Sequence, residues 1–415
     1  MPVTPERYLT LAEFFIDARG HLEGRSGKDP SFYEYGQDHA PLDKQTTLEG
    51  HAVRATLFAT GIVSAAQVNH RADYLAAATR FWDSLTKHKL YISGAAGAIE
   101  DDEKLGPDYF LPNDGYMETC AAVGVGFFGR NLNLLFGQAG YIDELERALY
   151  NAALGGTSLS GDRYYYQNPL IGEGNQRWEW HGCPCCPPMF LKLMGALPGY
   201  IYAQDAQAVY VNLFIGSQAQ LNVQGTSIAL QQSTQYPWED KVTFTLTHEK
   251  PVAFDLLLRL PAWAQPEPAN ALYRTINAPD TPQASITVNG ESVPLELERG
   301  YIRLSRIWNP GDMVELTLEM PVRQVVAHPA VEAAQGQVAL MRGPILYCVE
   351  EVDNPQGLDH LEIAPSATFT PVYRPDLLGG VVTLEGEGIT AVPFYASSNR
   401  EPGALRVWLP ARNPA

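Results

Sequence analysis

The spacing of apolar residues changes near residue 205, and this change constrains the fold more than any other feature of the sequence. Before it, apolar residues recur every three or four positions, which is typical of amphipathic helices. These segments are 5–19, 49–64, 68–87, 117–137 and 141–154. After it, short runs alternate between apolar and polar residues, as half-buried strands do. These runs are 208–216, 241–248, 254–260, 285–290, 301–307 and 313–320. We therefore expect a helical domain followed by antiparallel β-sandwich domains.

Three regions follow from this change in pattern. The 415 residues are enough for two or three domains with separate cores. We expect a helical domain at 1–204, a β-sandwich at 205–325, and a second sandwich or a continuation of the first at 326–415. Asn289-Gly290 and Pro310-Gly311 are turn signals within the β region.

Long loops rich in Gly, Pro, Asn and Asp separate the predicted helices. They cover 21–48, 93–116 and 155–188. Loops of such length inside a compact domain are usually functional. We therefore expect the helical scaffold to present the chemically active residues on loops at one face.

The formal charge of −18 argues against two classes of partner. An acidic surface repels nucleic acid and anionic membranes, so neither is expected to bind.

No apolar run reaches the roughly 18 residues of a membrane-spanning helix, and residues 1–20 are typical of an amphipathic helix, not of a secretion signal. The five cysteines are an odd number and three of them are clustered, which favours reduced thiols in a cytoplasmic protein.

The cysteine cluster in HGCPCCPP (181–188) is the strongest local signal for chemistry. Neighbouring cysteines rarely form a disulfide with each other, because disulfide geometry is demanding. Three clustered thiols are therefore more typical of metal binding or catalysis than of core packing. Prolines at 184, 187 and 188 argue against a regular helix, so we expect the cluster on a stiff, irregular loop.

A second segment, Glu118-Thr119-Cys120, offers a carboxylate and a thiol two residues apart. The two side chains would diverge on a regular helix, but they can converge at a helix start. With Cys185 and Cys186 they form a set of three sulfurs and one oxygen, which suits tetrahedral zinc. Spacing alone leaves two alternatives equally open, a structural zinc site and a catalytic one.

Other residues in the loops each allow a functional and a structural interpretation. The acidic run 100–103 could supply a general acid, although such runs usually lie on a solvated surface. His51 is either functional or a hydrogen-bonded core residue, and Cys348 lies in an apolar run typical of the core. Several aromatic residues could stack on a sugar or pack in the core, namely Tyr164, Tyr165, Tyr166, Trp178 and Trp180.

Several segments together resemble glycoside hydrolase family 127, the family of β-L-arabinofuranosidases. The matching stretches are GHAVRA (50–55), YISGAAGA (91–98), DDEKLGPDYFLPND (101–114), ETCAAVG (118–124), ERALYNAAL (146–154), YYQNPL (165–170), GCPCCPP (182–188) and AHPAVEAAQGQVALMRGPILYCVEEVDN (327–354). The pairing of ETC with CPCC is the most specific of these features. The resemblance covers most of the chain, and only the loop between LPND and ETC is one residue shorter than the commonest family form.

The resemblance implies an (α/α)6 barrel followed by β-sandwich domains. It also implies a zinc ion held by one glutamate and three cysteines, which correspond here to Glu118, Cys120, Cys185 and Cys186. Compared with the family, the chain begins within the helical domain. Residues 1–200 are too few for a closed six-pair barrel at about 12 residues per helix plus loops, so we expect a partial barrel with exposed apolar helix faces.

The reaction implied by the resemblance is retaining hydrolysis of terminal β-L-arabinofuranosides or related sugars. A free thiol is mostly protonated at neutral pH, and zinc ligation removes its proton. The resemblance gives Cys185 the attack on the anomeric carbon, while Glu103 protonates the leaving oxygen and later activates water. His51 and Tyr166 correspond to sugar-contacting residues, and Cys183 is a candidate to support the zinc ligands.

Two other functions stay open beside this one. In the first, zinc only fixes the loops, and the protein binds a glycan or a partner subunit without catalysis. The second is a cysteine peptidase, which needs a histidine paired with its nucleophile; His181 is close in sequence, but its proline-rich surroundings favour a metal. The expected ligand is a carbohydrate, and a homodimer is one assembly that the sequence allows.

Overall fold

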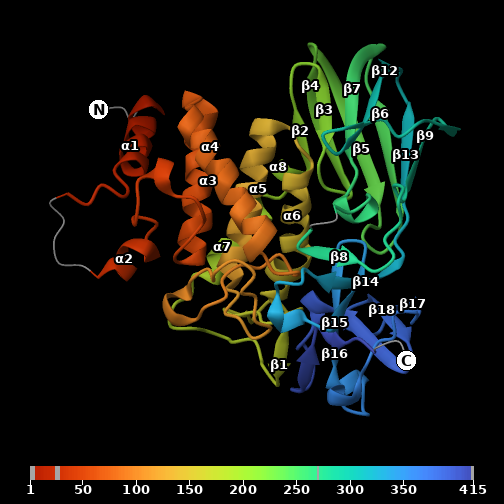
Figure 1. The fold of residues 1–415 in the computed structure, drawn as a ribbon. Helices are drawn as coiled ribbons and strands as arrows, with labels where there is room; N and C mark the ends of the chain where they lie inside the picture. The colour runs from red at the N-terminus through yellow and green to blue at the C-terminus, as the bar shows by residue number, and fades with distance from the viewer. Residues whose placement is uncertain (1–4, 24–28, 269–270, 413–415) are drawn as a thin grey trace.

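The computed structural model describes residues 5–23, 29–268 and 271–412, and a helical half lies beside a β half (Figure 1). The α-helices are α1 (Pro5–Asp17), α2 (Pro30–Tyr35), α3 (Ala52–Asn69), α4 (Ala72–Ser84), α5 (Thr119–Phe136), α6 (Gly140–Ala148), α7 (Cys186–Ala196) and α8 (Pro198–Ile201). Each of the five predicted helical segments overlaps one of α1, α3, α4, α5 and α6, although α3 continues to Asn69 and α6 begins one residue early, so the helices themselves are confirmed.

Shorter helical turns lie in both the helical half and the β half. α4 and α6 continue into the π-helical turns Leu85–Lys89 and Leu149–Ala153. Single 3-10 turns lie at Leu42–Lys44, Asp101–Glu103, Ala262–Ala264, Glu332–Ala334, Glu351–Asp353, Leu358–His360 and Phe394–Ala396. The predicted loop 21–48 contains α2, and its residues 24–28 lie outside the described part of the chain.

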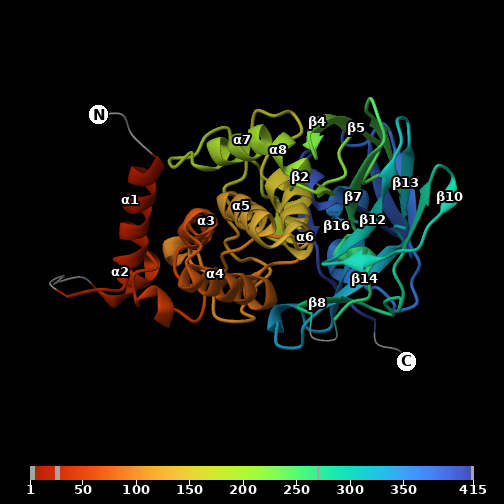
Figure 2. The same cartoon turned by 90° about the horizontal axis from the view of Figure 1, so that it is seen from above.

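Helix α5 lies at the centre of the helical domain. It packs against α3, α6 and α7, and its first four turns are almost entirely buried. Gly124 permits the close approach to α3, because a Cβ at this position would lie 2.1 Å from Thr56 Oγ1. Figure 2 shows the resulting layers, with α1 and α2 outermost, then α3 and α4, then α5 and α6 beside the sheets. The helices form part of an α/α barrel, as predicted.

The β half begins with a sandwich of two sheets. One sheet has the order β10 (Glu291–Ser292), β9 (Ala284–Val288), β13 (Met313–Leu318), β6 (Lys241–Thr247), β5 (Thr226–Thr234) and β4 (Ser217–Val223). The other has the order β11 (Leu297–Glu298), β12 (Tyr301–Trp308), β7 (Val252–Arg259), β3 (Ala208–Val211) and β2 (Tyr202–Gln204). Their inward apolar residues share one core. Asn289 and Gly290, at φ 53° and 82°, form the predicted tight turn between β9 and β10.

One strand pair departs from the expected antiparallel pairing. Strands β3 and β7 are parallel. The chain between them, β4 to β6, belongs to the opposite sheet, so it crosses over and re-enters the first sheet in the same direction.

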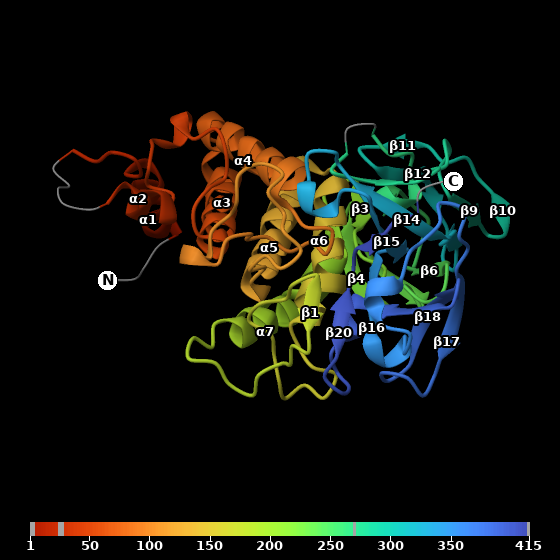
Figure 3. The same cartoon turned by 60° about the horizontal axis from the view of Figure 1, so that its bottom comes forward.

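A second sheet system follows near the C-terminus. Its main path is β17 (Thr370–Arg374), β18 (Val381–Gly386), β19 (Ile389–Pro393), β16 (Ile345–Glu350), β15 (Gln337–Arg342), β14 (Val322–Ala327) and β8 (Tyr273–Thr275). Strand β20 (Ala404–Arg406) pairs with β16 and with β1 (Ile171–Glu173), and β21 (Leu409–Pro410) pairs with β15. Figure 3 shows β1 beside β20. The long loop that precedes the cysteine cluster is therefore anchored to the C-terminal sheet.

A buried arginine joins the helical domain to the sandwich. Arg259, at the end of β7, is fully buried and makes ion pairs with Glu146 and, at 2.6 Å, with Asp143, both on α6. Its Nε also donates to the Asn212 carbonyl at 2.6 Å. The Tyr236 hydroxyl donates to the same Glu146 carboxylate. This network fixes α6, and through it α5, against the sandwich.

The outer face of α1 is apolar and exposed. Tyr8, Leu11, Phe14 and Phe15 are each more than half exposed, which confirms the expectation of exposed apolar helix faces. Among the helices that the structure describes, none combines the length and hydropathy needed to cross a bilayer.

We expect Arg259→Met to lower the free energy of unfolding by about 3–5 kcal/mol, because it leaves two buried carboxylates without their cation. Urea denaturation at neutral pH measures this. The matched control is Arg303→Met, whose ion pairs with Asp255 and Glu298 are screened by solvent, so it should lower the free energy of unfolding far less. Equal losses in the two variants would contradict the role assigned to Arg259.

Candidate metal and catalytic site

Two helix N-termini bring the four predicted metal ligands together. Glu118 immediately precedes α5 with an extended backbone, at φ −60° and ψ 134°, and Cys120 lies in the first turn of that helix. The bend between them lets both side chains face the same point, as predicted for a helix start. Cys185 and Cys186 begin α7. One oxygen or sulfur from each residue lies within 4.8 Å of all the others.

The prediction that the whole cluster lies on an irregular loop is wrong for Cys186. This residue is the first of α7, and Pro187 and Pro188 follow it in the first turn. Proline is tolerated there because the first backbone N–H groups of a helix have no intrahelical acceptor. The prolines therefore begin a helix and do not prevent one.

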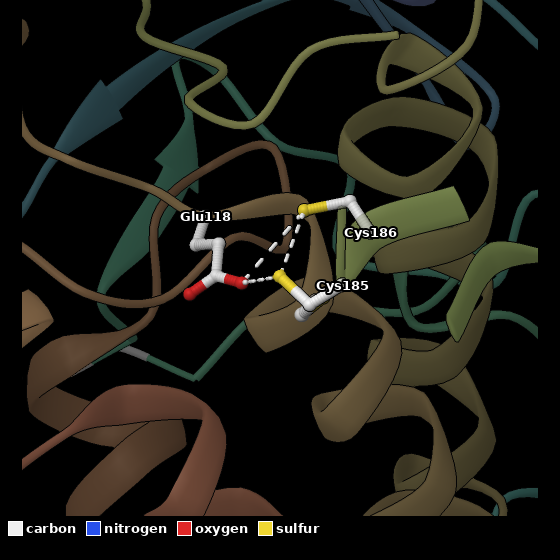
Figure 4. Close-up of side chains that lie close together, drawn as sticks. Glu118, Cys185 and Cys186 are labelled. Carbon is white, nitrogen blue, oxygen red and sulfur yellow. Dashed lines mark hydrogen bonds between the residues drawn. The ribbon is translucent and has the colours of Figure 1, made fainter. Parts of the chain in front are cut away.

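The spacing of the ligand atoms fits a tetrahedral metal site. Cys185 Sγ lies 3.2 Å from Glu118 Oε1 and 3.7 Å from Cys186 Sγ, and Cys186 Sγ lies 3.7 Å from the same oxygen (Figure 4). Zinc–ligand bond lengths in a tetrahedron place two sulfurs about 3.8 Å apart, and a sulfur and an oxygen about 3.6 Å apart. Glu118 Oε2 is buried and has no hydrogen-bond partner among the described residues. The donor set and this orphaned oxygen both fit a bound cation.

The pKa values of the four candidate ligands are shifted in different directions. Hydrogen bonds with Cys120 and then with Cys186 hold the pKa of Cys185 well below its ordinary value. The pKa of Cys120 is raised, first because its thiol hydrogen-bonds to Cys185. Burial, followed by the neighbouring Cys185 sulfur, raises the pKa of Glu118 to about 9. Cys185 is therefore the thiol of this cluster that ionises most readily.

Glu103 lies beside the cluster and is held by three side chains. Its carboxylate accepts hydrogen bonds from the Tyr116 hydroxyl at 3.0 Å and from the Tyr166 hydroxyl at 3.2 Å, and His51 Nε2 lies 2.9 Å from Oε2. Asp102 and Glu103 both have left-handed backbone angles, with φ 58° and 53°. Two such non-glycine residues in succession are uncommon and typical of functional sites.

The backbone around His51 determines which of its ring nitrogens carries the hydrogen. His51 precedes α3, and its Nδ1 accepts from the N–H groups of Val53 and Arg54 at 3.2 and 3.4 Å. The hydrogen therefore lies on Nε2, which donates to Glu103. Burial, more than any other effect, lowers the pKa of His51. His51 is thus a neutral donor to the carboxylate.

Backbone hydrogen bonds hold these loops in register. Leu105 N–H donates to the Gly50 carbonyl at 2.9 Å, which ties the Glu103 segment to the start of α3. Thr119 N–H donates to the Tyr166 carbonyl at 2.9 Å, which ties Tyr166 to the start of α5. The predicted site residues thus come from separate loops but have fixed relative positions.

An open cleft of about 890 Å³ gives access to these residues. It is lined by His51, Glu103, Glu118, Cys120, Tyr166 and Cys185, among others. His181 also lines it and stacks on Trp178, with ring centroids 4.4 Å apart. Cys183 is exposed at the rim. A volume of this size suits a small sugar ligand.

Three other residues named from the sequence, Cys348, Trp180 and His181, are not part of the candidate metal cluster. Cys348 is buried in β16, as expected for a core residue. Trp180 is largely exposed and is absent from the lining of the cleft. His181 Nδ1 accepts from the Cys183 N–H at 3.1 Å, which does not match the histidine–thiol pair of a peptidase. A second cavity, of about 620 Å³ beside α6 and the sheets, contains none of the predicted site residues.

Tyr116 is the contact to Glu103 that sequence reasoning missed. It lies in the segment between LPND and ETC, two residues before Glu118, but no spacing rule links it to Glu103. Its only sequence signal is its place beside a predicted metal ligand.

Comparison with known proteins gives this site a family. Models of glycoside hydrolase family 127 match the chain in order: the beta-L-arabinofuranosidase catalytic domain at residues 3–199, the middle domain at 208–320 and the C-terminal domain at 322–410. The chain belongs to glycoside hydrolase family 127. It is a glycosidase, and the family resemblance seen in the sequence is confirmed.

Individual members of family 127 are similar along almost the whole chain. The non-reducing end beta-L-arabinofuranosidase of Bifidobacterium longum subsp. longum is 32% identical, over 97% of this chain and 68% of that protein. A family 127 beta-L-arabinofuranosidase structure from Geobacillus stearothermophilus T6 has a TM-score of 0.90 at 34% identity, covering 98% of this chain and 70% of that one. Another family 127 beta-arabinofuranosidase structure has a TM-score of 0.92 at 36% identity, covering 98% and 66%. The chain spans about two thirds of the length of these relatives.

We expect His51→Asn to make the protein less sensitive to mild acid. Burial keeps His51 neutral in the folded state, whereas the unfolded state takes up a proton near pH 6.5. The neutral form therefore contributes stability that is present above about pH 6.5 and is lost as the pH falls. Asparagine can still accept the α3 N–H hydrogen bonds but does not titrate.

Melting temperatures measured between about pH 7 and about pH 5 test this expectation. The wild type should lose stability relative to His51→Asn as the pH falls. The control His360→Asn, at an exposed position, should follow the wild type. Parallel curves for the wild type and His51→Asn would refute the assignment of a buried neutral histidine.

Proposed function

We propose that this protein is a retaining glycosidase that uses Cys185 as its nucleophile and Glu103 as its general acid/base. One observation carries the proposal: Glu118 lies between the two groups, with a carboxylate oxygen within 4.8 Å of one of Glu103 and Oε1 only 3.2 Å from Cys185 Sγ, and both Glu103 and Cys185 line the same cleft. Because the two groups share this neighbour within one cleft, they are close enough to act on the same glycosidic bond. The names of its relatives support terminal β-L-arabinofuranosides as the substrate.

Burial supports Cys185 as the nucleophile among the three clustered ligand thiols. Cys120 and Cys186 are almost completely buried, whereas Cys185 is partly exposed and lines the cleft. Its low pKa favours the thiolate, which is the nucleophilic form of cysteine. Cys185 thus combines access to the sugar with the required charge.

We propose zinc as the cation of this site, held by Glu118, Cys120, Cys185 and Cys186. The three sulfurs, the single oxygen and the tetrahedral spacing support this choice. When bound, zinc would keep the ligand thiols ionised and fix their positions.

The reaction then follows from the chain's own residues. The Cys185 thiolate attacks the anomeric carbon while Glu103 donates a proton to the leaving oxygen, and a glycosyl thioether forms on Cys185. Glu103, now a carboxylate, takes a proton from water, and the hydroxide displaces the thiolate from the sugar. Two displacements at one carbon retain its configuration. His51 and Tyr166 line the cleft beside Glu103 and can contact the sugar there, and the Tyr166 hydroxyl oxygen can still accept a hydrogen bond from a sugar hydroxyl.

The proposal predicts one zinc per chain and hydrolysis of 4-nitrophenyl β-L-arabinofuranoside. Cys185→Ser should lower kcat by at least about 10³-fold, because a serine hydroxyl is not ionised at neutral pH. Metal content by mass spectrometry and release of 4-nitrophenol measure the two effects.

Cys348→Ala is the matched control, since it removes a thiol outside the site. It should keep both zinc and turnover. A protein that binds zinc and glycan but hydrolyses no furanoside would instead be a noncatalytic binding protein. In that case Cys185→Ser would lower only the melting temperature and leave glycan binding unchanged.

A further inference from the structure

Tyr116 is hydrogen-bonded directly to the proposed general acid, Glu103. Its hydroxyl donates to Glu103 Oε1 at 3.0 Å. Unlike His51 and Tyr166, Tyr116 does not line the cleft. We propose that Tyr116 is a positioning residue that holds the Glu103 carboxyl in the orientation for proton donation. This inference rests on the role of Glu103 in the proposed function.

Three side chains bind the two oxygens of the Glu103 carboxyl group. Tyr116 binds Oε1, His51 Nε2–H binds Oε2 at 2.9 Å, and the Tyr166 hydroxyl reaches both oxygens at 3.2 and 3.3 Å. The Tyr116 ring packs edge-on against the Tyr166 ring, with centroids 5.9 Å apart. Tyr116 therefore binds Oε1 without lining the cleft, and it packs against the ring whose hydroxyl also binds Glu103.

The hydrogen bond of Tyr116 can survive the loss of the proton from Glu103. His51 can only donate, because its Nδ1 is occupied by the start of α3. A tyrosine hydroxyl can donate or accept. Tyr116 can accept from the carboxylic acid and donate to the carboxylate, so it can hold the group throughout the proton transfer. Its loss would leave Oε1 with the Tyr166 hydroxyl alone.

Proton donation matters most when the leaving group is a poor one. A 4-nitrophenol leaves as a stable anion and needs little help, whereas methanol or a sugar hydroxyl needs a proton. A residue that acts through the general acid should therefore affect poor leaving groups selectively. A residue with a merely structural role should lower the rate for both kinds of substrate.

We would compare kcat/KM for 4-nitrophenyl and methyl β-L-arabinofuranosides in three zinc-loaded single variants. Glu103→Gln should lower kcat/KM for the methyl glycoside at least about 100-fold more than for the aryl glycoside. Tyr116→Phe should shift this ratio in the same direction by about tenfold, through kcat and not KM. The control Tyr165→Phe removes a buried hydroxyl that donates to the Asn175 carbonyl, and it should leave the ratio unchanged.

A double variant of Tyr116 and Glu103 distinguishes an effect through Glu103 from a general effect on folding. If Tyr116 acts through Glu103, then adding Tyr116→Phe to Glu103→Gln should change the ratio no further. An unchanged ratio in Tyr116→Phe, or an additive loss in the double variant, would overturn the inference while leaving the role of Glu103 intact. An unchanged ratio in Glu103→Gln would overturn both, because Glu103 would not be the general acid.

Discussion

The convergence of two helix N-termini on one point is the constraint on which the site depends. Glu118 and Cys120 begin α5, and Cys185 and Cys186 begin α7. The N-terminal ends of helices carry partial positive charge, which favours carboxylates and thiolates. The two helices contact each other, and α5 is buried between α3 and α6. The core of the helical domain, rather than the loops themselves, therefore sets the distances among the four ligand groups.

Glu103, the proposed general acid, is attached to the fold by a different route. Glu103 lies in a short left-handed turn whose next residues hydrogen-bond to the start of α3. The proposed nucleophile, Cys185, and the other candidate metal ligands lie at the starts of α5 and α7. Tyr166 joins these two parts of the site, because its backbone carbonyl accepts from the Thr119 N–H at the start of α5 while its hydroxyl donates to Glu103. One aromatic residue thus couples the two halves of the proposed reaction.

The sequence was sufficient where function depends on residue type at short spacing. The clustered cysteines, the Glu118–Cys120 pair and the change from helical to strand periodicity were all visible in it. Features created by tertiary contacts were not. Nothing in the sequence linked Tyr116 to Glu103, Arg259 to α6 or β1 to β20, since these partners are far apart along the chain or lack any regular spacing. The prediction of an irregular loop at Pro187 and Pro188 was wrong because proline disrupts the interior of a helix but is tolerated in its first turn.

Charge explains why this donor set belongs at helix ends. Three thiolates and one carboxylate carry four negative charges, and a divalent cation would neutralise only two. In the protein alone, a single thiolate is favoured at Cys185, while the pKa values of Glu118 and Cys120 are raised. Cation binding would therefore release protons from the most buried ligands, and the remaining negative charge would face two positive helix ends. The same field would stabilise the Cys185 thiolate when it departs from the sugar, so the geometry that favours metal binding also favours the second displacement.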